Sequence, residues 1–344
     1  MEMLMKFEKY IELHKEQVYK KILEYLPRRE PKAHYDWVSE YSSRRGKYAR
    51  PSLIMLWCEL YGGKVEDAIL PAAAMQASED WILVHDDIMD GNEIRRGKPT
   101  LHKMAGVDFA INAGDSLHTV NMRMVHDAAK RLGPDRGEKF FDMFTEMLLV
   151  TAEGQYYDMM LTKRVKDIRN FTLEDYYKSI AAKTSYYTVY GPMQFGAMIA
   201  GQKDAELERI KEYGYPLGIA FQMKDDILDC LADEKKFGKT IGNDIMEGVK
   251  TAILWHFVHN ASEPDLKKVE AVYKKERQEK TKEDVKMVMD MFKKYNSFDF
   301  AQEKMDEFGK QAIDKFEKNT KHIPEGEIKE AARDSITYSF KRTK

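Results

Sequence analysis

Proline is scarce in this chain, and its placing limits the folds that the chain can adopt. Only ten of the 344 residues are proline, and none lies between Pro134 and Pro192, so proline does not interrupt a helix there. Side chains in that interval recur at the three- and four-residue spacing of one buried helical face: Phe140, Phe141, Phe144, Met147, Leu148, Thr151, Gln155 and Met159. Alternating runs between Asn-Gly or Asp-Gly turns, typical of strands, are missing. The pattern predicts an all-α protein built of long helices.

No shift of composition, low-complexity segment or short repeat divides the chain. The length of 344 residues would allow two domains of about 150 residues each, but nothing marks a boundary, and we expect a single domain over residues 1–344. Residues 263–294 mix charges of both signs with apolar residues at helical spacing. This pattern is typical of the solvated outer helices of a bundle.

The charges of the chain nearly cancel, with 56 Lys and Arg against 58 Asp and Glu. We therefore expect no nucleic-acid partner and no general attraction to anionic membranes, so that phosphate groups would bind only at a local site. The first twenty residues are rich in charge, and no run of 18 apolar residues follows, which predicts no signal peptide and no membrane span. Two cysteines, Cys58 and Cys230, suit a reducing compartment. We expect a cytoplasmic protein.

Two acidic clusters share the pattern Asp-Asp-x-x-Asp, and each follows an apolar stretch. They are Asp86-Asp87-x-x-Asp90 and Asp225-Asp226-x-x-Asp229. On a helix, positions i and i+4 lie on one face about 5–6 Å apart, so the first and last Asp of each cluster point the same way. Desolvated carboxylates this close repel one another unless a cation lies among them. Oxygen ligands of this kind suit Mg²⁺, which takes its other ligands from water and from substrate phosphates.

Other kinds of site fit the sequence poorly. A di-iron bundle needs Glu-x-x-His pairs, no P-loop motif occurs, and two cysteines are too few for a zinc or iron–sulfur site. Basic residues instead gather near both acidic clusters: Lys47, Arg50, Arg95, Arg96, Lys239 and Lys250. Because Arg offers bidentate hydrogen bonds and Lys a point charge, this set with Mg²⁺ predicts a diphosphate site.

The motifs of the chain, taken in order, resemble those of the trans-isoprenyl diphosphate synthases, the family of farnesyl and geranylgeranyl diphosphate synthases. The similarity extends from about Gly46 to Thr251 and is strongest to archaeal-type short-chain enzymes. Its motifs are Gly46-Lys47-x-x-Arg50-Pro51, His85-Asp86-Asp87-x-x-Asp90, Arg95-Arg96-Gly97-x-Pro99, Gly114-Asp115, Gly154-Gln155-x-x-Asp158, Lys183-Thr184, Phe221-Gln222-x-x-Asp225-Asp226-x-x-Asp229 and Gly238-Lys239-x-x-x-x-Asp244.

The resemblance implies a helical bundle around a large central cavity, with the two acidic clusters facing each other across it, and a homodimer. It implies that three Mg²⁺ ions hold the diphosphate of an allylic substrate between Asp86, Asp90 and Asp225, with help from Arg95, Lys183 and Lys239. All six aspartates of the two clusters are candidate metal ligands. Isopentenyl diphosphate would bind to Lys47, Arg50 and Arg96.

The same resemblance implies the reaction. Metal ions and cationic side chains would stabilise the leaving diphosphate as the allylic C–O bond breaks. Dipoles near Lys183, Thr184 and Gln222 would face the allylic carbocation, and an apolar cavity would keep water away from it. The double bond of isopentenyl diphosphate would then attack, and a proton would leave to the departing diphosphate.

Two positions depart from the family pattern. Seven residues before the first Asp the family usually carries His or Gln, but here Glu79 stands there, followed by Asp80. An anion beside a diphosphate weakens its binding unless it is protonated, paired or turned away. The family also has Lys five residues after Asp244, where this chain has Val249 and then Lys250, about 100° further around a helix.

In this family the residues four and five before the first Asp help to set the floor of the chain pocket. Here they are Ile82 and Trp81. A single aromatic at that floor, with no insertion in the first motif, implies geranylgeranyl diphosphate (C20) as product. The bulk of Trp81, with Met122 and Met124 as possible additions to the floor, keeps farnesyl diphosphate (C15) as the alternative.

Two other functions share part of this pattern. A terpene cyclase ionises the same kind of substrate, but it normally has a second motif of Asn/Ser/Glu type, which the cluster at Asp225 does not match. A non-catalytic subunit that regulates a prenyl synthase would be expected to lose metal ligands. Both clusters are complete here, and Glu79 is the one feature that favours such a subunit.

Overall fold

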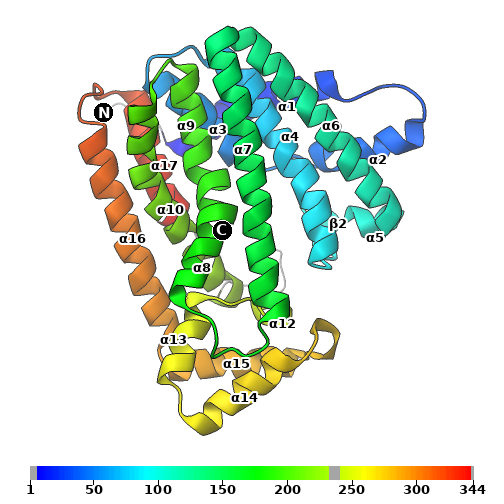
Figure 1. Ribbon diagram of the computed structural model, residues 1–344, viewed down its shortest axis with the longest axis vertical. Coiled ribbons are helices and arrows are strands. Elements are labelled where there is room, and N and C mark those ends of the chain that lie inside the picture. The colour runs from blue at the N-terminus through cyan, green and yellow to red at the C-terminus, as the bar shows by residue number, and fades with distance from the viewer. Residues whose placement is uncertain (1–5, 232–240, 342–344) are drawn as a thin grey trace. The chain divides into compact units, whose positions relative to one another are not determined.

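The computed structural model describes residues 6–231 and 241–341. These residues are almost entirely helical (Figure 1), which confirms the all-α prediction. None of the described helices combines the length and the apolar character needed to cross a membrane. The described chain divides into two compact units.

Unit 1 contains the described residues of Met1–Glu146, Gly191–Ile210 and Thr320–Ser335. Its elements are α1 (Phe7–Tyr25), α2 (Lys32–Ser43), α3 (Ala49–Leu60), α4 (Val65–Met89), the short strands β1 (Ile94–Arg95) and β2 (Lys98–Pro99), α5 (Leu101–Ala105), α6 (Val107–Leu132) and α9 (Gly191–Ile199). The two strands form one small hairpin, an exception to the prediction that strands are missing.

Helix α4 is the centre of unit 1. Its first turn carries the acidic residues Glu66 and Asp67. Their negative charges interact favourably with the positive end of the helix dipole. Beyond it, Ala72, Ala73 and Ala74 are fully buried. Their small side chains allow the neighbouring helices to approach closely. α4 packs on α3, on α1 and along α6, which lies beside it in Figure 1. This packing fixes the C-terminal end of α4, where the first acidic cluster lies.

Unit 2 contains the described residues of Met147–Tyr190, Lys211–Asn319 and Ile336–Lys344. Its elements are the π-helices η1 (Met160–Arg164) and η2 (Ala181–Tyr190), α8 (Leu173–Ile180), α12 (Asn243–Glu247), α13 (Ala252–Asn260), α14 (Glu263–Lys274), the 3₁₀ turn η3 (Arg277–Glu279), α15 (Lys282–Lys294) and α16 (Ser297–Asn319). α8 and α15 each begin with a capping box, Thr172 with Asp175 and Thr281 with Asp284.

Three helices begin in unit 1 and end in unit 2: α7 (Pro134–Met159), α10 (Asp204–Leu231) and α17 (Glu327–Lys341). Most of the buried face predicted for α7 is confirmed: Phe140, Phe144 and Met147 are fully buried. Phe141 was expected on the same face but is 36% exposed, since it follows Phe140 by one residue and so points about 100° away.

Candidate functional site

The first acidic motif lies at the C-terminal end of α4. Asp86 and Asp87 belong to its last turn, and Asp90 follows the helix, with its backbone N–H donating to the Asp86 carbonyl at 2.9 Å. The helical register therefore continues to Asp90 and keeps it on the face of Asp86, as the spacing predicts. The Asp86 side chain is 20% exposed, and Asp90 is half-buried. Both carboxylates are within reach of solvent.

Asp87 differs from its neighbours because its side chain is fully buried. Tyr41 of α2 donates its hydroxyl to Asp87 Oδ2 at 2.7 Å, and the Asn92 amide donates to Oδ1 at 3.1 Å. Arg95 donates from Nε to Oδ1 at 3.0 Å and pairs with the same carboxylate through Nη2. Since both oxygens are hydrogen-bonded, the carboxylate is a fixed anchor for the end of α4. The predicted site residue Arg95 is thereby held 3.8 Å from Asp86.

The hairpin after the motif positions two arginines at once. Its turn residues, Arg96 and Gly97, have φ values of 51° and 75°, and positive φ at both central positions is the type I′ turn that suits a two-residue hairpin. Arg95, before the turn, reaches Asp87. Arg96 reaches back along α4, where its Nη1 lies 2.9 Å from Asp80 Oδ1.

The two arginines predicted to bind isopentenyl diphosphate meet at Glu79. Arg50 Nη1 lies 3.0 Å from Glu79 Oε2, and Arg96 Nη2 lies 3.5 Å from Oε1. Burial alone would raise the pKa of Glu79, but the positive charges of Arg50 and Arg96 outweigh it and hold this pKa below its usual range. The third predicted cation, Lys47, is exposed just before α3.

The second acidic motif lies on α10 and repeats the arrangement of the first. Asp225 and Asp229 are half-buried, whereas Asp226 is 4% exposed. Tyr176 of α8 donates its hydroxyl to Asp226 Oδ2 at 2.7 Å, and Gln222 donates its amide to Oδ1 at 2.9 Å. Burial raises the pKa of Asp226 to about 7, although these two hydrogen bonds oppose the shift.

Predicted site residues of η2 lie beside this motif. The Thr184 hydroxyl donates to Gln222 Oε1 at 3.0 Å, which links η2 to α10. Lys183 Nζ lies 2.6 Å from Asp158 Oδ2 on α7. The helices approach this closely because residue 154 is glycine: a Cβ there would lie 2.4 Å from the backbone nitrogen of Lys183.

The segment after the second motif returns to its last aspartate. The backbone N–H of Asp244, on α12, donates to Asp229 Oδ2 at 3.0 Å. Lys250, predicted to bind substrate, is 4% exposed, and its ammonium group donates to the Gly248 carbonyl at 2.9 Å. Its substrate role stays a prediction. Lys239 lies outside the described residues.

Trp81, the predicted floor residue, is half-buried on α4. Its ring packs against His118 of α6, with centroids 4.7 Å apart, and against His85 at 5.9 Å. Gly114 allows His85 to lie against α6, because a Cβ at position 114 would be 2.4 Å from His85 Nε2. Met124 belongs to the core and Met122 is half-buried.

Sequence patterns missed several partners of the site residues. Tyr41 and Tyr176 contact motif residues, and His118 contacts Trp81, each from a helix that is distant in sequence, and no local spacing marks them. Within the described chain, no three His, Cys, Asp or Glu side chains are already arranged as a metal site.

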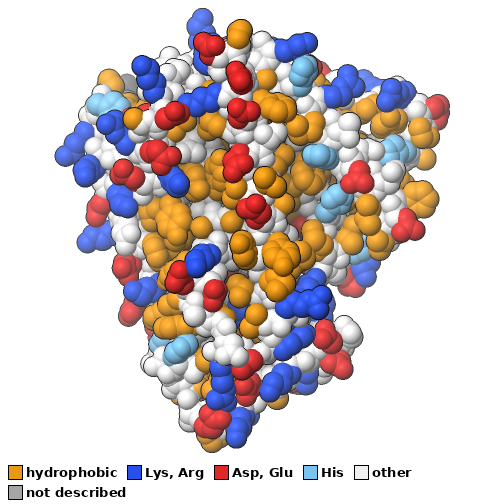
Figure 2. All heavy atoms as spheres, in the orientation of Figure 1, with side chains coloured by type: hydrophobic (Ala, Val, Ile, Leu, Met, Phe, Trp, Pro, Cys, Tyr) orange, Lys and Arg blue, Asp and Glu red, His pale blue; other side chains and the backbone are white. Residues whose placement is uncertain are grey.

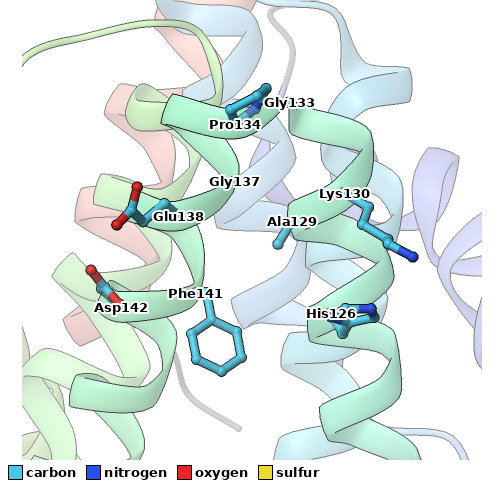
Figure 3. Close-up of a pocket in the computed structure, with 9 residues that line it drawn as sticks. All are labelled: His126, Ala129, Lys130, Gly133, Pro134, Gly137, Glu138, Phe141 and Asp142. Carbon is cyan, nitrogen blue, oxygen red and sulfur yellow. The ribbon is translucent and has the colours of Figure 1, made fainter.

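A groove of about 530 Å³ lies between the end of α6 and the beginning of α7 (Figure 3). Residues of both helices line it, among them His126, Lys130, Glu138 and Phe141. None of the predicted site residues belongs to this groove, so it is not the cavity that the resemblance implies. That central cavity stays a prediction.

Comparisons with known proteins give one consistent family. The family model described as polyprenyl synthetase matches residues 32–292. The geranylgeranyl diphosphate synthase of Sulfolobus acidocaldarius is 37% identical over 270 residues, covering 78% of this chain and 79% of that protein. The geranylfarnesyl diphosphate synthase of Aeropyrum pernix is 33% identical, covering 64% of this chain and 69% of that protein. The crystal structure of geranylgeranyl pyrophosphate synthetase from Pyrococcus horikoshii matches with a TM-score of 0.84 and 32% identity, covering 98% of both chains.

Proposed function

Because the chain belongs to the polyprenyl synthetase family, we propose that it is a prenyltransferase that condenses isopentenyl diphosphate with allylic diphosphates. The product is a short-chain all-trans prenyl diphosphate, and geranylgeranyl diphosphate (C20) is its main form. The observation that carries the proposal is the pair of acidic motifs. In each, the middle Asp is locked by a tyrosine, and the outer two are half-buried on one helical face.

The donor set fits a divalent metal. Each outer pair offers only oxygen ligands at i and i+4, the kind that Mg²⁺ accepts together with water and substrate oxygens. We propose Asp86, Asp90 and Asp225 as ligands of three Mg²⁺ ions, with Asp229 contributing on the second motif. When bound, the metal supplies positive charge that stabilises the departing diphosphate. Asp87 and Asp226, also predicted as ligands, orient the motifs instead, because their oxygens already accept protein hydrogen bonds.

The basic residues bind and orient the two substrates. Arg95, Lys183 and Lys239 take the allylic diphosphate, and Lys47, Arg50 and Arg96 take isopentenyl diphosphate, with Lys250 as an additional contact. Arg95 suits this role because its pair with Asp87 fixes the guanidinium beside the first motif. The Thr184 hydroxyl and the Gln222 amide are hydrogen-bonded to each other, so their dipoles are already oriented before the allylic cation forms.

We propose that the protein acts as a homodimer through α7. Three side chains of this helix, Phe141, Leu149 and Tyr156, are 36%, 57% and 56% exposed. Their spacing of seven and eight residues places them on one side of the helix. Figure 2 shows apolar side chains gathered on the face of the molecule where α7 lies. A contiguous apolar surface of this kind is typical of a protein interface.

We also propose that residues 1–344 form one synthase domain in the cytoplasm. The family match from residue 32 to residue 292 includes parts of both units, which supports one domain. Both cysteines are buried free thiols, as a reducing compartment favours.

Farnesyl diphosphate (C15) remains the second candidate product. The observation that favours it is the packing of Trp81 on His118, with ring centroids 4.7 Å apart. A large ring held in place by a second ring leaves less room for a growing chain than a single smaller aromatic would.

The test is an assay of the purified protein with Mg²⁺, isopentenyl diphosphate and each allylic diphosphate from C5 to C15. Products are sized by chromatography, and we expect C20 to dominate. A chelator should stop turnover, and added Mg²⁺ should restore it. Failure to extend any allylic diphosphate would overturn the proposed activity.

Asp86→Ala and Asp225→Ala should each abolish turnover and leave the helical circular dichroism spectrum unchanged, because each removes a half-buried metal ligand without opening a core cavity. Asp142→Ala, at an exposed position of α7, is the matched control and should stay active. An active Asp86→Ala protein would contradict the metal assignment.

A further inference from the structure

Glu79 forms the centre of a small charged network on α4. Its two carboxylate oxygens face different arginines, Oε2 facing Arg50 at 3.0 Å and Oε1 facing Arg96 at 3.5 Å. The side chains of Arg50, Arg96 and Glu79 are 23%, 14% and 16% exposed. The network is therefore largely withdrawn from water but has an open side, where solvent screens its charges only in part.

Asp80, the next residue, plays a different part from Glu79. It is 1% exposed and accepts hydrogen bonds from Ser42 at 2.8 Å and from Gln76 at 3.1 Å. Arg96 Nη1 lies 2.9 Å from the same carboxylate. Arg96 thus keeps a buried anion as its anchor whether or not Glu79 stays in place. The charged groups that pair with Glu79 are both arginines, and Glu79 is the more exposed of the two carboxylates.

From this arrangement we propose that Glu79 is an internal competitor of isopentenyl diphosphate. Its carboxylate occupies the arginine donors that would bind the diphosphate, and substrate binding displaces it toward the open side of the network. The inference rests on the proposed function, because it takes Arg50 and Arg96 as the isopentenyl diphosphate site. It follows that this chain binds that substrate more weakly than a chain with a neutral side chain at position 79.

The physical reason is a difference between two states. In the empty site, Glu79 neutralises one unit of the positive charge of Arg50 and Arg96. Binding of a diphosphate breaks these ion pairs and leaves Glu79 near a second anion. The free energy of breaking the pairs reduces the net binding free energy of the substrate. The allylic diphosphate is assigned to Arg95, Lys183 and Lys239, and its binding should not change.

The experiment measures the dissociation constant of isopentenyl diphosphate by isothermal titration calorimetry, without allylic substrate. Glu79→Gln keeps the length and hydrogen-bonding capacity of the side chain and removes only its charge. We expect it to bind isopentenyl diphosphate about five- to tenfold more tightly than the unmodified protein, as the loss of one partly buried repulsive charge predicts. Its KM for isopentenyl diphosphate should fall, and its KM for the allylic substrate should stay the same.

The matched control is Glu66→Gln, which makes the same chemical change at an exposed position of the same helix. Its binding should equal that of the unmodified protein. Glu79→Ala serves as a second variant: it removes the competing anion altogether and should also bind more tightly. Circular dichroism spectra confirm that each variant is folded.

The possible results distinguish a failure of the competition by Glu79 from a failure of the proposed isopentenyl diphosphate site. If both Glu79 variants bind isopentenyl diphosphate equally well or more weakly, while the unmodified protein binds it and turns over, Glu79 is an organising partner of the arginines and the inference is wrong. If neither the unmodified protein nor the variants bind it, the site assignment fails together with the inference.

Discussion

Within each acidic motif the middle carboxylate is buried and the outer two are half-buried. Asp87 and Asp226 each accept a tyrosine hydroxyl at 2.7 Å from a helix that is distant in sequence. An ionised or polar group without such a donor would be costly to bury. The tyrosines therefore hold the two motifs in the rotation that turns the outer aspartates toward solvent.

Tyr41→Phe and Tyr176→Phe each remove one hydrogen bond to a buried carboxylate. We expect each change to lower the free energy of unfolding by about 1.5–3 kcal/mol, the range for hydrogen bonds to charged groups. The Mg²⁺ concentration for half-maximal activity should rise, because the outer aspartates lose orientation. Urea unfolding and Mg²⁺ titration of activity measure the two effects.

Tyr35→Phe and Tyr177→Phe are the matched controls, since both residues are half-buried on the same two helices. They should change neither quantity by much. If Tyr41→Phe destabilises the protein but leaves the Mg²⁺ titration unchanged, the tyrosine has a structural role only.

Trp81 is the residue for which the product length can be tested directly. Trp81→Ala should lengthen the main product by at least one C5 unit, because the indole is removed and Ser78, one turn earlier on α4, is small and fully buried. Products are sized by chromatography. Trp255→Ala, which removes another half-buried indole, should leave the spectrum unchanged. An unaltered spectrum in Trp81→Ala would place the floor elsewhere, with Met122 the next candidate.

Two buried ammonium groups hold the C-terminal end of α12. Lys280 donates to the Ile245 carbonyl at 2.8 Å, and Lys250 donates to the Gly248 carbonyl at 2.9 Å. Both Nζ atoms lie over the Tyr273 ring, 5.4 Å and 5.3 Å from its centroid. Positive charges at a helix C-terminus complement its exposed carbonyls. This short helix carries the backbone N–H of Asp244 to the second motif.

Burial lowers the pKa of Lys280 to about 8. The unfolded chain keeps that proton up to about pH 10.4. Between pH 8 and 10 the unfolded state therefore binds more protons at this site, and the contribution of Lys280 to the free energy of unfolding rises with pH. We therefore expect the free energy of unfolding of the unmodified protein, measured relative to that of Lys280→Met, to increase by about 1–3 kcal/mol between pH 8 and pH 10.

Denaturant unfolding at pH 7.5 and 9.5 measures this difference, with Lys274→Met as control. Lys274 is exposed near the end of α14, and its substitution should give the same difference at both pH values. A Lys280→Met difference that does not change with pH would mean that the ammonium group keeps its proton throughout.

Local spacing predicted individual helices well but not how the chain passes between them. In residues 263–294, Val269, Val272 and Val288 are buried as their period predicts. The absence of proline after Pro134 did not give one long helix, because the capping box of Thr172 with Asp175 starts α8 separately. In α15, Phe292 is buried with Val285 and Val288, whereas Met291 is half-buried, since a shift of one residue rotates a helix by about 100°.

For the site, the sequence identified the motif residues but not their partners. The i and i+4 spacing correctly placed Asp86 with Asp90, because that relation depends on one helix alone. The burial of Asp87 depends on Tyr41, which lies in α2, and no sequence rule relates the two positions. The inward turn of Lys250 follows in the same way from Tyr273 of α14.

At the scale of the whole molecule, the exposed apolar side of α7 should be covered by a second copy of the chain. Leu149→Lys places a charge in that surface and should convert dimers to monomers, because a buried unpaired charge is strongly unfavourable. Size-exclusion chromatography with light scattering measures the mass. Leu13→Lys, at a residue of α1 that is 54% exposed, is the control and should leave the dimer intact. A monomeric unmodified protein would contradict the homodimer.

The boundary between the two units falls within α7, α10 and α17, and this has a consequence for how the protein melts. On either side of the boundary in α7, Phe144 and Met147 are both fully buried. If one unit unfolded alone, three helices would end in mid-turn, with their hydrogen bonds broken and these side chains exposed. New helix ends are unfavourable, so the loss of order in one unit should spread to the other. We expect a single cooperative transition in scanning calorimetry, and two resolved peaks would show that the units melt independently.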